Sequence, residues 1–205
     1  MIESIYKQLL TQYEVEPSTS ENFWKELNDL YSSNNRYYHN LNHLSDLFAE
    51  VQAVKSSINN WNIILFTLFY HDAIYKSTKK NNEEKSAELA IKRMTEIGFN
   101  QAEVQLCYDQ IIATKSHARS EDSDTNYFTD ADLSILGRDE KTYIAYCKNI
   151  RFEYAIYPEF MYKKGRRNVV KHFLSMDRIY KTDFFFDKYE SHARENLRAE
   201  LDVLG

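Results

Sequence analysis

The chain has 205 residues and a formal net charge of -5 at pH 7, which argues against a nucleic-acid surface over the whole molecule and leaves room only for local basic patches. Only 4 Gly and 2 Pro interrupt it, far below ordinary usage, so we predict an all-α fold of long helices joined by short polar turns. The length suits one domain, and we expect residues 1–205 to form a single domain.

The cysteines and the apolar segments predict where the protein is found. Cys107 and Cys147 lie in helix-like segments with no secretory signal before them, so free thiols in a reducing compartment are expected. The longest uncharged apolar run is shorter than the roughly 18 residues that span a bilayer. We therefore expect a soluble, cytoplasmic protein without a membrane partner.

The first half of the chain predicts several helices by apolar spacing. Residues 2–13 form the first, and Pro17 with a capping box from Ser18 to Glu21 opens the second. A third carries an apolar stripe over residues 41–51, just after the sequence RYYHN.

Two histidines lie at the start of the third helix. His39 and His43 are four residues apart and share a face if the helix has begun by His39. Alternatively, Asn40 caps the helix and leaves His39 in the loop.

The segment LFTLFYHDAIY, residues 65–75, is the one around which the chain is organised. No charged residue lies between 61 and 70, and the apolar run ends on His71 and Asp72. A buried imidazole beside an ionised carboxylate is costly, and a bound cation would compensate both. In the alternative reading, Asp72 pairs with a basic side chain and His71 is a satisfied core histidine.

Helix-capping signals divide the rest of the chain. Asn81 is placed to cap a helix that Gly98 ends, and Asn100 with Glu103 forms a capping box for the next. The polar residues 116–126 predict a surface loop. Further segments follow: a helical turn ending at residue 137, a helix over 140–154, a solvated turn KKGRR at 163–167 and a last amphipathic helix over 187–204.

Two imidazoles and two carboxylates form a dispersed set of potential metal ligands. His43, His71, Asp72 and Asp132 offer mixed nitrogen and oxygen donors, which suit Mn, Fe, Co, Ni, Zn or Mg and leave open positions on a six-coordinate ion. Those positions can hold water or phosphate, and a bound cation activates water at neutral pH.

Five segments occur in a fixed order over residues 36–137: YHNLNHLSDL, YHDAIY, NEEKSAE, IIATKSH and DADLSILG. In that order they resemble motifs of the HD-domain superfamily of metal-dependent phosphohydrolases, notably its cyclic-nucleotide phosphodiesterase branch. RYYHNLNHL, FYHDAIY, NEEKSA and DADLSILG together resemble the group described as predicted metal-dependent HD phosphohydrolases, and this similarity runs on through GRRNVVKHFL and ARENLRAEL.

The resemblance implies an HD-type helical core at about residues 20–155, with the helices of 156–205 packed on it. It also implies a divalent metal ion, with one ion expected and a second left open. The implied ligands are His43, His71, Asp72 and Asp132. His39 falls at the position of a general-acid histidine.

The chain also departs from the phosphodiesterase pattern. Tyr75 stands where that branch has a second histidine, so its two-metal arrangement stays open here. NEEKSAE matches only with a shift of one residue, which leaves the acidic catalytic residue open among Glu83, Glu84 and Glu88. We take Glu83 as the first candidate. The base-selecting glutamine and aromatic clamp are not recognisable, so a cyclic nucleotide is not implied as substrate.

Three further residues are candidates for phosphate or a second metal: Arg36, His117 and Arg166. Each also has a structural reading, for example His117 as a positive charge at a helix C-terminus or Arg166 in a solvated turn. Asp130 is expected to cap the turn or support Asp132.

We expect an enzyme that hydrolyses a phosphate ester or anhydride of a small molecule, with a nucleotide as the expected substrate and no nucleic-acid partner. A metal-containing module that senses a nucleotide or phosphate without turnover is the alternative, and an oxidative di-iron protein is a third. The oligomeric state is open.

Overall fold

The computed structural model describes all 205 residues, and every regular element in it is helical. This confirms the predicted all-α fold. The first elements are α1 (Ile2–Thr11), α2 (Pro17–Tyr31), α3 (Leu41–Ala53), a 3-10 turn η1 (Lys55–Ser57), α4 (Trp61–Tyr70), α5 (Asn82–Ile97) and α6 (Gln101–Ala113). They are followed by α7 (Ser123–Asp132), a 3-10 helix η2 (Leu133–Gly137), α8 (Glu140–Glu153), α9 (Glu159–Ser175) and α10 (Asp183–Leu204).

The chain divides into two compact units, Met1–Thr129 and Asp130–Gly205, and the division falls inside α7. None of the helices combines the length and the apolar character that crossing a bilayer requires. The single domain with a core at about 20–155 stays a prediction.

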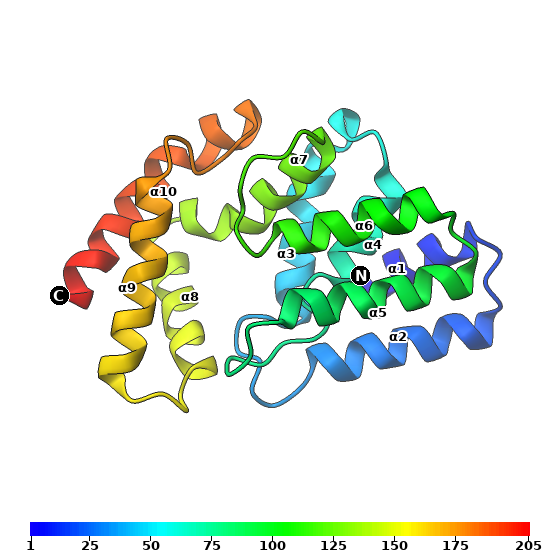
Figure 1. The fold of residues 1–205 in the computed structure, drawn as a ribbon, viewed down its shortest axis with the longest axis horizontal. Coiled ribbons are helices and arrows are strands. Elements are labelled where there is room, and N and C mark those ends of the chain that lie inside the picture. Colours follow the sequence, from blue (N-terminus) through cyan, green and yellow to red (C-terminus); the bar gives the residue numbers. More distant parts are fainter. The chain divides into compact units, whose positions relative to one another are not determined.

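The first unit is built around α4, which packs against α1, α3, α5 and α6 (Figure 1). Every residue from 63 to 70 is buried, because an uncharged, apolar sequence places no polar face toward water. The few polar atoms there find partners: the hydroxyls of Tyr6 and Tyr70 lie 2.7 Å apart, and the Tyr31 hydroxyl donates to the Phe69 carbonyl at 3.1 Å. This packing fixes the end of α4, where His71 and Asp72 follow.

The second unit is organised by α10, which packs against η2 and α9. Gly137 at the end of η2 lies directly against Tyr189 of α10, so that a Cβ there would come within 2.6 Å of the tyrosine Cβ. Asp130 is fully buried and accepts hydrogen bonds from the Lys181 and Thr182 backbone amides, so its carboxylate holds the segment before α10. The Lys181 ammonium lies 2.9 Å from the same carboxylate.

Three local predictions are wrong. The capping box from Ser18 to Glu21 does not form, because α2 already begins at Pro17 with Glu16 as its N-cap. The loop predicted over 116–126 ends early, since Asp122 accepts from the Thr125 amide and α7 begins at Ser123.

The predicted turn KKGRR, residues 163–167, lies inside α9. A single glycine costs a helix only about 1 kcal/mol, and nothing lies within 4 Å of a Cβ at Gly165. Burial of Arg166, Val170 and Phe173 along α9 offsets that cost.

Other boundaries follow the sequence. Gly98 ends α5 with a left-handed φ of 94°, which glycine adopts without steric cost. The Asn100 and Glu103 capping box at α6 is present in both directions. Asn81 is the N-cap of α5, although its side chain makes no capping hydrogen bond.

Candidate metal centre

The start of α3 fixes the first histidine. The Asn40 side chain accepts hydrogen bonds from the Asn42 and His43 amides at 2.9 and 3.4 Å. It is therefore the N-cap, as one of the two readings of the sequence predicted, and His39 lies in the preceding loop. His43 is on the first turn of α3 and is 6% exposed.

The end of α4 fixes the second histidine and its tautomer. The His71 amide continues the helix by donating to the Thr67 carbonyl at 2.8 Å. Its side-chain Nδ1 lies 2.9 Å from the Leu68 carbonyl, and because a carbonyl can only accept, Nδ1 carries the hydrogen. In the neutral ring, Nε2 then holds the lone pair, which is the form that binds a metal.

Three donor atoms meet where α3 and α4 approach each other. The Nε2 atoms of His43 and His71 are 3.2 Å apart. Asp72 Oδ2 lies 3.1 Å from the His71 Nε2 and 3.9 Å from the His43 Nε2. Lone pairs that converge in this way repel one another unless a proton or a cation lies among them.

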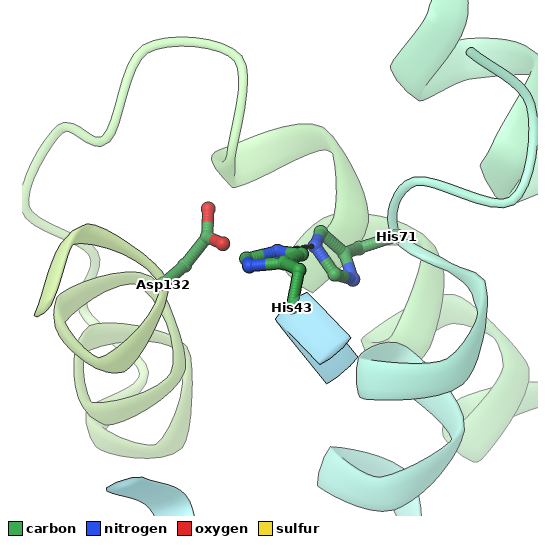
Figure 2. Close-up of side chains that lie close together, drawn as sticks. All are labelled: His43, His71 and Asp132. Atoms are coloured by element: carbon green, nitrogen blue, oxygen red, sulfur yellow. Dashed lines mark hydrogen bonds between the residues drawn. The ribbon is translucent and has the colours of Figure 1, made fainter. Parts of the chain in front are cut away.

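Asp132, the last residue of α7, completes a possible ligand set. One ligand atom each from His43, His71 and Asp132 lies within 4.8 Å of the others, and the three could hold a metal ion. Figure 2 shows the two imidazoles side by side and the Asp132 carboxylate turned toward them. Both histidines are buried, and Asp132 is half-buried.

His39 is held beside this group by aromatic contacts. Its ring stacks on Tyr75 with 4.2 Å between centroids and 29° between planes, and Tyr38 meets it edge-on at 5.0 Å. Its Nε2 is 3.9 Å from Asp72 Oδ2, and the side chain keeps 18% exposure to solvent. His39 can therefore exchange protons with solvent while it lies next to the Asp72 carboxylate.

Arg36 ties the His39 loop to the turn after α4. One of its terminal nitrogens donates to the His39 and Asp72 carbonyls at 3.0 and 2.7 Å, and the other donates to the Ala73 carbonyl at 2.7 Å. The bond to Asp72 is thus to its backbone and leaves the carboxylate facing the histidines. These contacts hold the backbone on both sides of the candidate centre.

The acidic candidates on α5 are paired with lysines. Glu84 bonds Lys115, which lowers the pKa of the Glu84 carboxyl and raises that of Lys115. Glu83 lies 3.9 Å from the same ammonium, and Glu88 lies 2.6 Å from Lys85. Glu83 as a catalytic residue stays a prediction.

The two remaining candidates occupy different settings. His117 lies just beyond α6 with a positive φ of 51°, and its role toward a second metal stays a prediction. Arg166 in the second unit is 8% exposed, and its guanidinium donates two hydrogen bonds to the Glu200 carboxylate, at 2.7 and 3.0 Å. That carboxylate already occupies two edge nitrogens of the guanidinium.

Two contacts of the centre were not found from the sequence. The Leu68 carbonyl sets the His71 tautomer, and Tyr75 stacks on His39. Leu68 precedes His71 by three residues, so the helical turn was a usable signal. Nothing in the sequence connects Tyr75 with His39, and the residue is distinguished there only by standing in place of a histidine.

Comparison with protein-family models, with curated proteins and with solved structures returns no match to this chain.

Proposed function

We propose that the chain is a metal-dependent phosphohydrolase of the HD type, which cleaves a phosphate ester or anhydride of a small molecule such as a nucleotide. The observation that carries the proposal is the convergence of His43, His71 and Asp132 within 4.8 Å. The motif resemblance over residues 36–137 supports it.

The donor set fits a divalent cation. Two imidazole nitrogens and one or two carboxylate oxygens are ligands that Mn, Fe, Co, Ni, Zn and Mg accept to different degrees. The His71 Nδ1 bond to the Leu68 carbonyl is the outer contact that a ligating histidine usually makes. Asp72, 3.1 Å from the His71 Nε2, adds the negative charge that offsets the cation.

The residues of the chain would divide the work of hydrolysis. A bound cation would supply Lewis-acid stabilisation of phosphoryl oxygens and an acidified water. The Asp72 carboxylate would orient that water and accept its proton. His39, outside the three-residue cluster and partly exposed, would donate a proton to the leaving oxygen.

The test is loading the purified chain with Mn, Co, Mg, Ni, Zn or Fe(II), followed by a screen of phosphorylated metabolites. Asp72→Ala should lose most of the bound metal and all turnover, because it removes an anionic donor beside His71. His192→Ala on the exposed face of α10 is the matched control and should change neither. Full metal occupancy and activity in Asp72→Ala would contradict the assignment.

The same screen separates the enzyme from a sensing module. A sensor would bind a phosphorylated compound in the loaded state without releasing product. His39 favours the enzyme, because a pure binding site has no leaving group to protonate. Consumption of oxygen by an iron-loaded chain would instead identify oxidative chemistry.

A further inference from the structure

A small polar pocket lies between the end of α2 and the start of α3, and its lining ends at the residue before His43. Its volume is about 200 Å³, and its lining includes Ser32, Ser33, Arg36, Asn40 and Asn42. Since a water molecule occupies roughly 30 Å³ in the liquid, the pocket has room for a tetrahedral oxyanion. All of its lining residues belong to the first unit.

The positive charge of Arg36 lacks the carboxylate partner that Arg93 and Arg166 have. Arg93 and Arg166 each place Nε and a terminal nitrogen on the two oxygens of one carboxylate, Glu26 and Glu200 respectively. Arg36 is 8% exposed, yet no carboxylate pairs with it, and its buried Nε has no hydrogen-bond partner.

The contacts that Arg36 does make are with neutral groups. They are three backbone carbonyls and the rings of Tyr31 and Tyr75, whose centroids lie 4.8 and 5.6 Å from the guanidinium carbon. Burying a cation without an anion is unfavourable. A negatively charged ligand near the guanidinium would relieve that cost.

The start of α3 adds to the positive potential of the pocket. The helix has 13 residues, and its N-terminal amides carry a partial positive charge that favours anions. The Asn40 side chain satisfies two of these amides. The exposed side chain of Asn42, on the first turn, offers its amide NH2 group as a further donor at the pocket.

We propose that this pocket is a binding site for a phosphate group, with the Arg36 guanidinium as its charged anchor. Because Arg36 also bonds the His39 and Asp72 carbonyls, a phosphate bound to it would lie next to the loop that carries His39. Its use as a substrate subsite rests on the proposed function, whereas the binding of phosphate does not.

The experiment uses the full chain, stripped of metal, and titrates it with inorganic phosphate by calorimetry and by melting temperature. The key variant is Asn42→Asp, which is isosteric and adds a negative charge to the pocket. Its control is Gln101→Glu, which makes the same amide-to-carboxylate change on the exposed first turn of α6. Both acids suit a helix start, so neither variant should unfold.

Phosphate should bind to the wild type and to Gln101→Glu with equal Kd, and to Asn42→Asp at least about tenfold more weakly, because like charges repel in the pocket. Arg36→Met should lose phosphate binding. If Arg36→Met misfolds, the comparison of Asn42→Asp with the wild type still tests the pocket. Equal phosphate affinity in wild type and Asn42→Asp, or no binding by the wild type at millimolar phosphate, would overturn the proposal.

The outcomes for the pocket and for the enzyme are separable. Phosphate binding by the metal-free chain without turnover by the loaded chain would keep the pocket and refute the phosphohydrolase. Turnover by the loaded chain, without phosphate binding by the metal-free chain, would support the phosphohydrolase and refute the phosphate pocket.

Discussion

Replacement of His39 by Ala tests the division of roles between the two histidines at the start of α3. His39 lies in the loop before the helix and His43 on its first turn. His39 is outside the cluster of three potential ligands, so His39→Ala should keep the metal. His43→Ala should lose metal and activity together.

The expected loss of rate depends on the leaving group. General-acid catalysis contributes about 10²- to 10⁴-fold, which at about 1.36 kcal/mol per tenfold is roughly 2.7–5.4 kcal/mol of barrier. That loss should appear in kcat on an alkyl or ribosyl phosphate. The nitrophenolate of a nitrophenyl phosphate leaves without needing a proton, so His39→Ala should hydrolyse this substrate at close to the wild-type rate.

The structural cost of the same substitution can be estimated from its contacts. The stacked pair of His39 and Tyr75 contributes about 0.5–1.5 kcal/mol if it behaves as an aromatic pair. For a chain of this size that corresponds to a melting temperature lower by about 1–6 °C. Equal rate losses on both substrates, with the metal retained, would refute the role of His39 as an acid and leave it a structural residue.

Further predictions concern the fold. Gly137→Ala should lower the free energy of unfolding by about 1–3 kcal/mol, because the new Cβ meets Tyr189 backbone and side chain at 2.6–2.9 Å. Gly165→Ala, with nothing within 4 Å, should raise it by about 0.5–1 kcal/mol. Urea titration measures the free energy of unfolding of both variants, and changes of the same sign would contradict the packing described for the two glycines. Burial raises the pKa of the Cys107 thiol from 9.0 to about 12. The unfolded thiol therefore loses its proton first, and stability should fall as pH rises from 9 toward 12. Cys107→Ala should reduce this slope, and an unchanged slope in pH-dependent melting would refute the shift. Asp124→Asn should cost about 1.5–3 kcal/mol, since the carboxylate accepts from the two backbone amides that precede α4. A loss below 0.5 kcal/mol in urea titration, on the order of a surface substitution, would contradict this.

Local signals in the sequence predicted most helices, because apolar spacing and caps act within a few residues. Gly98 and the Asn100 capping box are examples. The failures occur where tertiary packing decides. The KKGRR segment is helical because α9 buries Arg166 against Glu200 of α10, and no spacing rule connects two residues 34 positions apart.

The candidate site, too, has parts that local sequence signals predicted and parts that depend on tertiary packing. One of the two readings of the sequence had Asn40 as the cap before His43, and the apolar run predicted that His71 stands at the end of α4. The approach of their Nε2 atoms to 3.2 Å depends on how α3 packs on α4, which only the resemblance could suggest. The three hydrogen bonds from Arg36 to backbone carbonyls could not be predicted from the sequence, because every residue type carries the same backbone acceptor.

The most direct test of the central claim is the metal content of the purified chain, combined with its melting temperature before and after chelation. A ligand at 100 times its Kd stabilises the folded state by about 2.7 kcal/mol, which for this length is a shift of roughly 5–11 °C. We expect about one divalent ion per chain, a fall of that size on chelation and recovery on adding the metal back. In His71→Ala, both the ion and the shift should be absent. A wild-type chain that binds no divalent ion and melts at one temperature with or without chelator would contradict the metal centre and the proposed function with it.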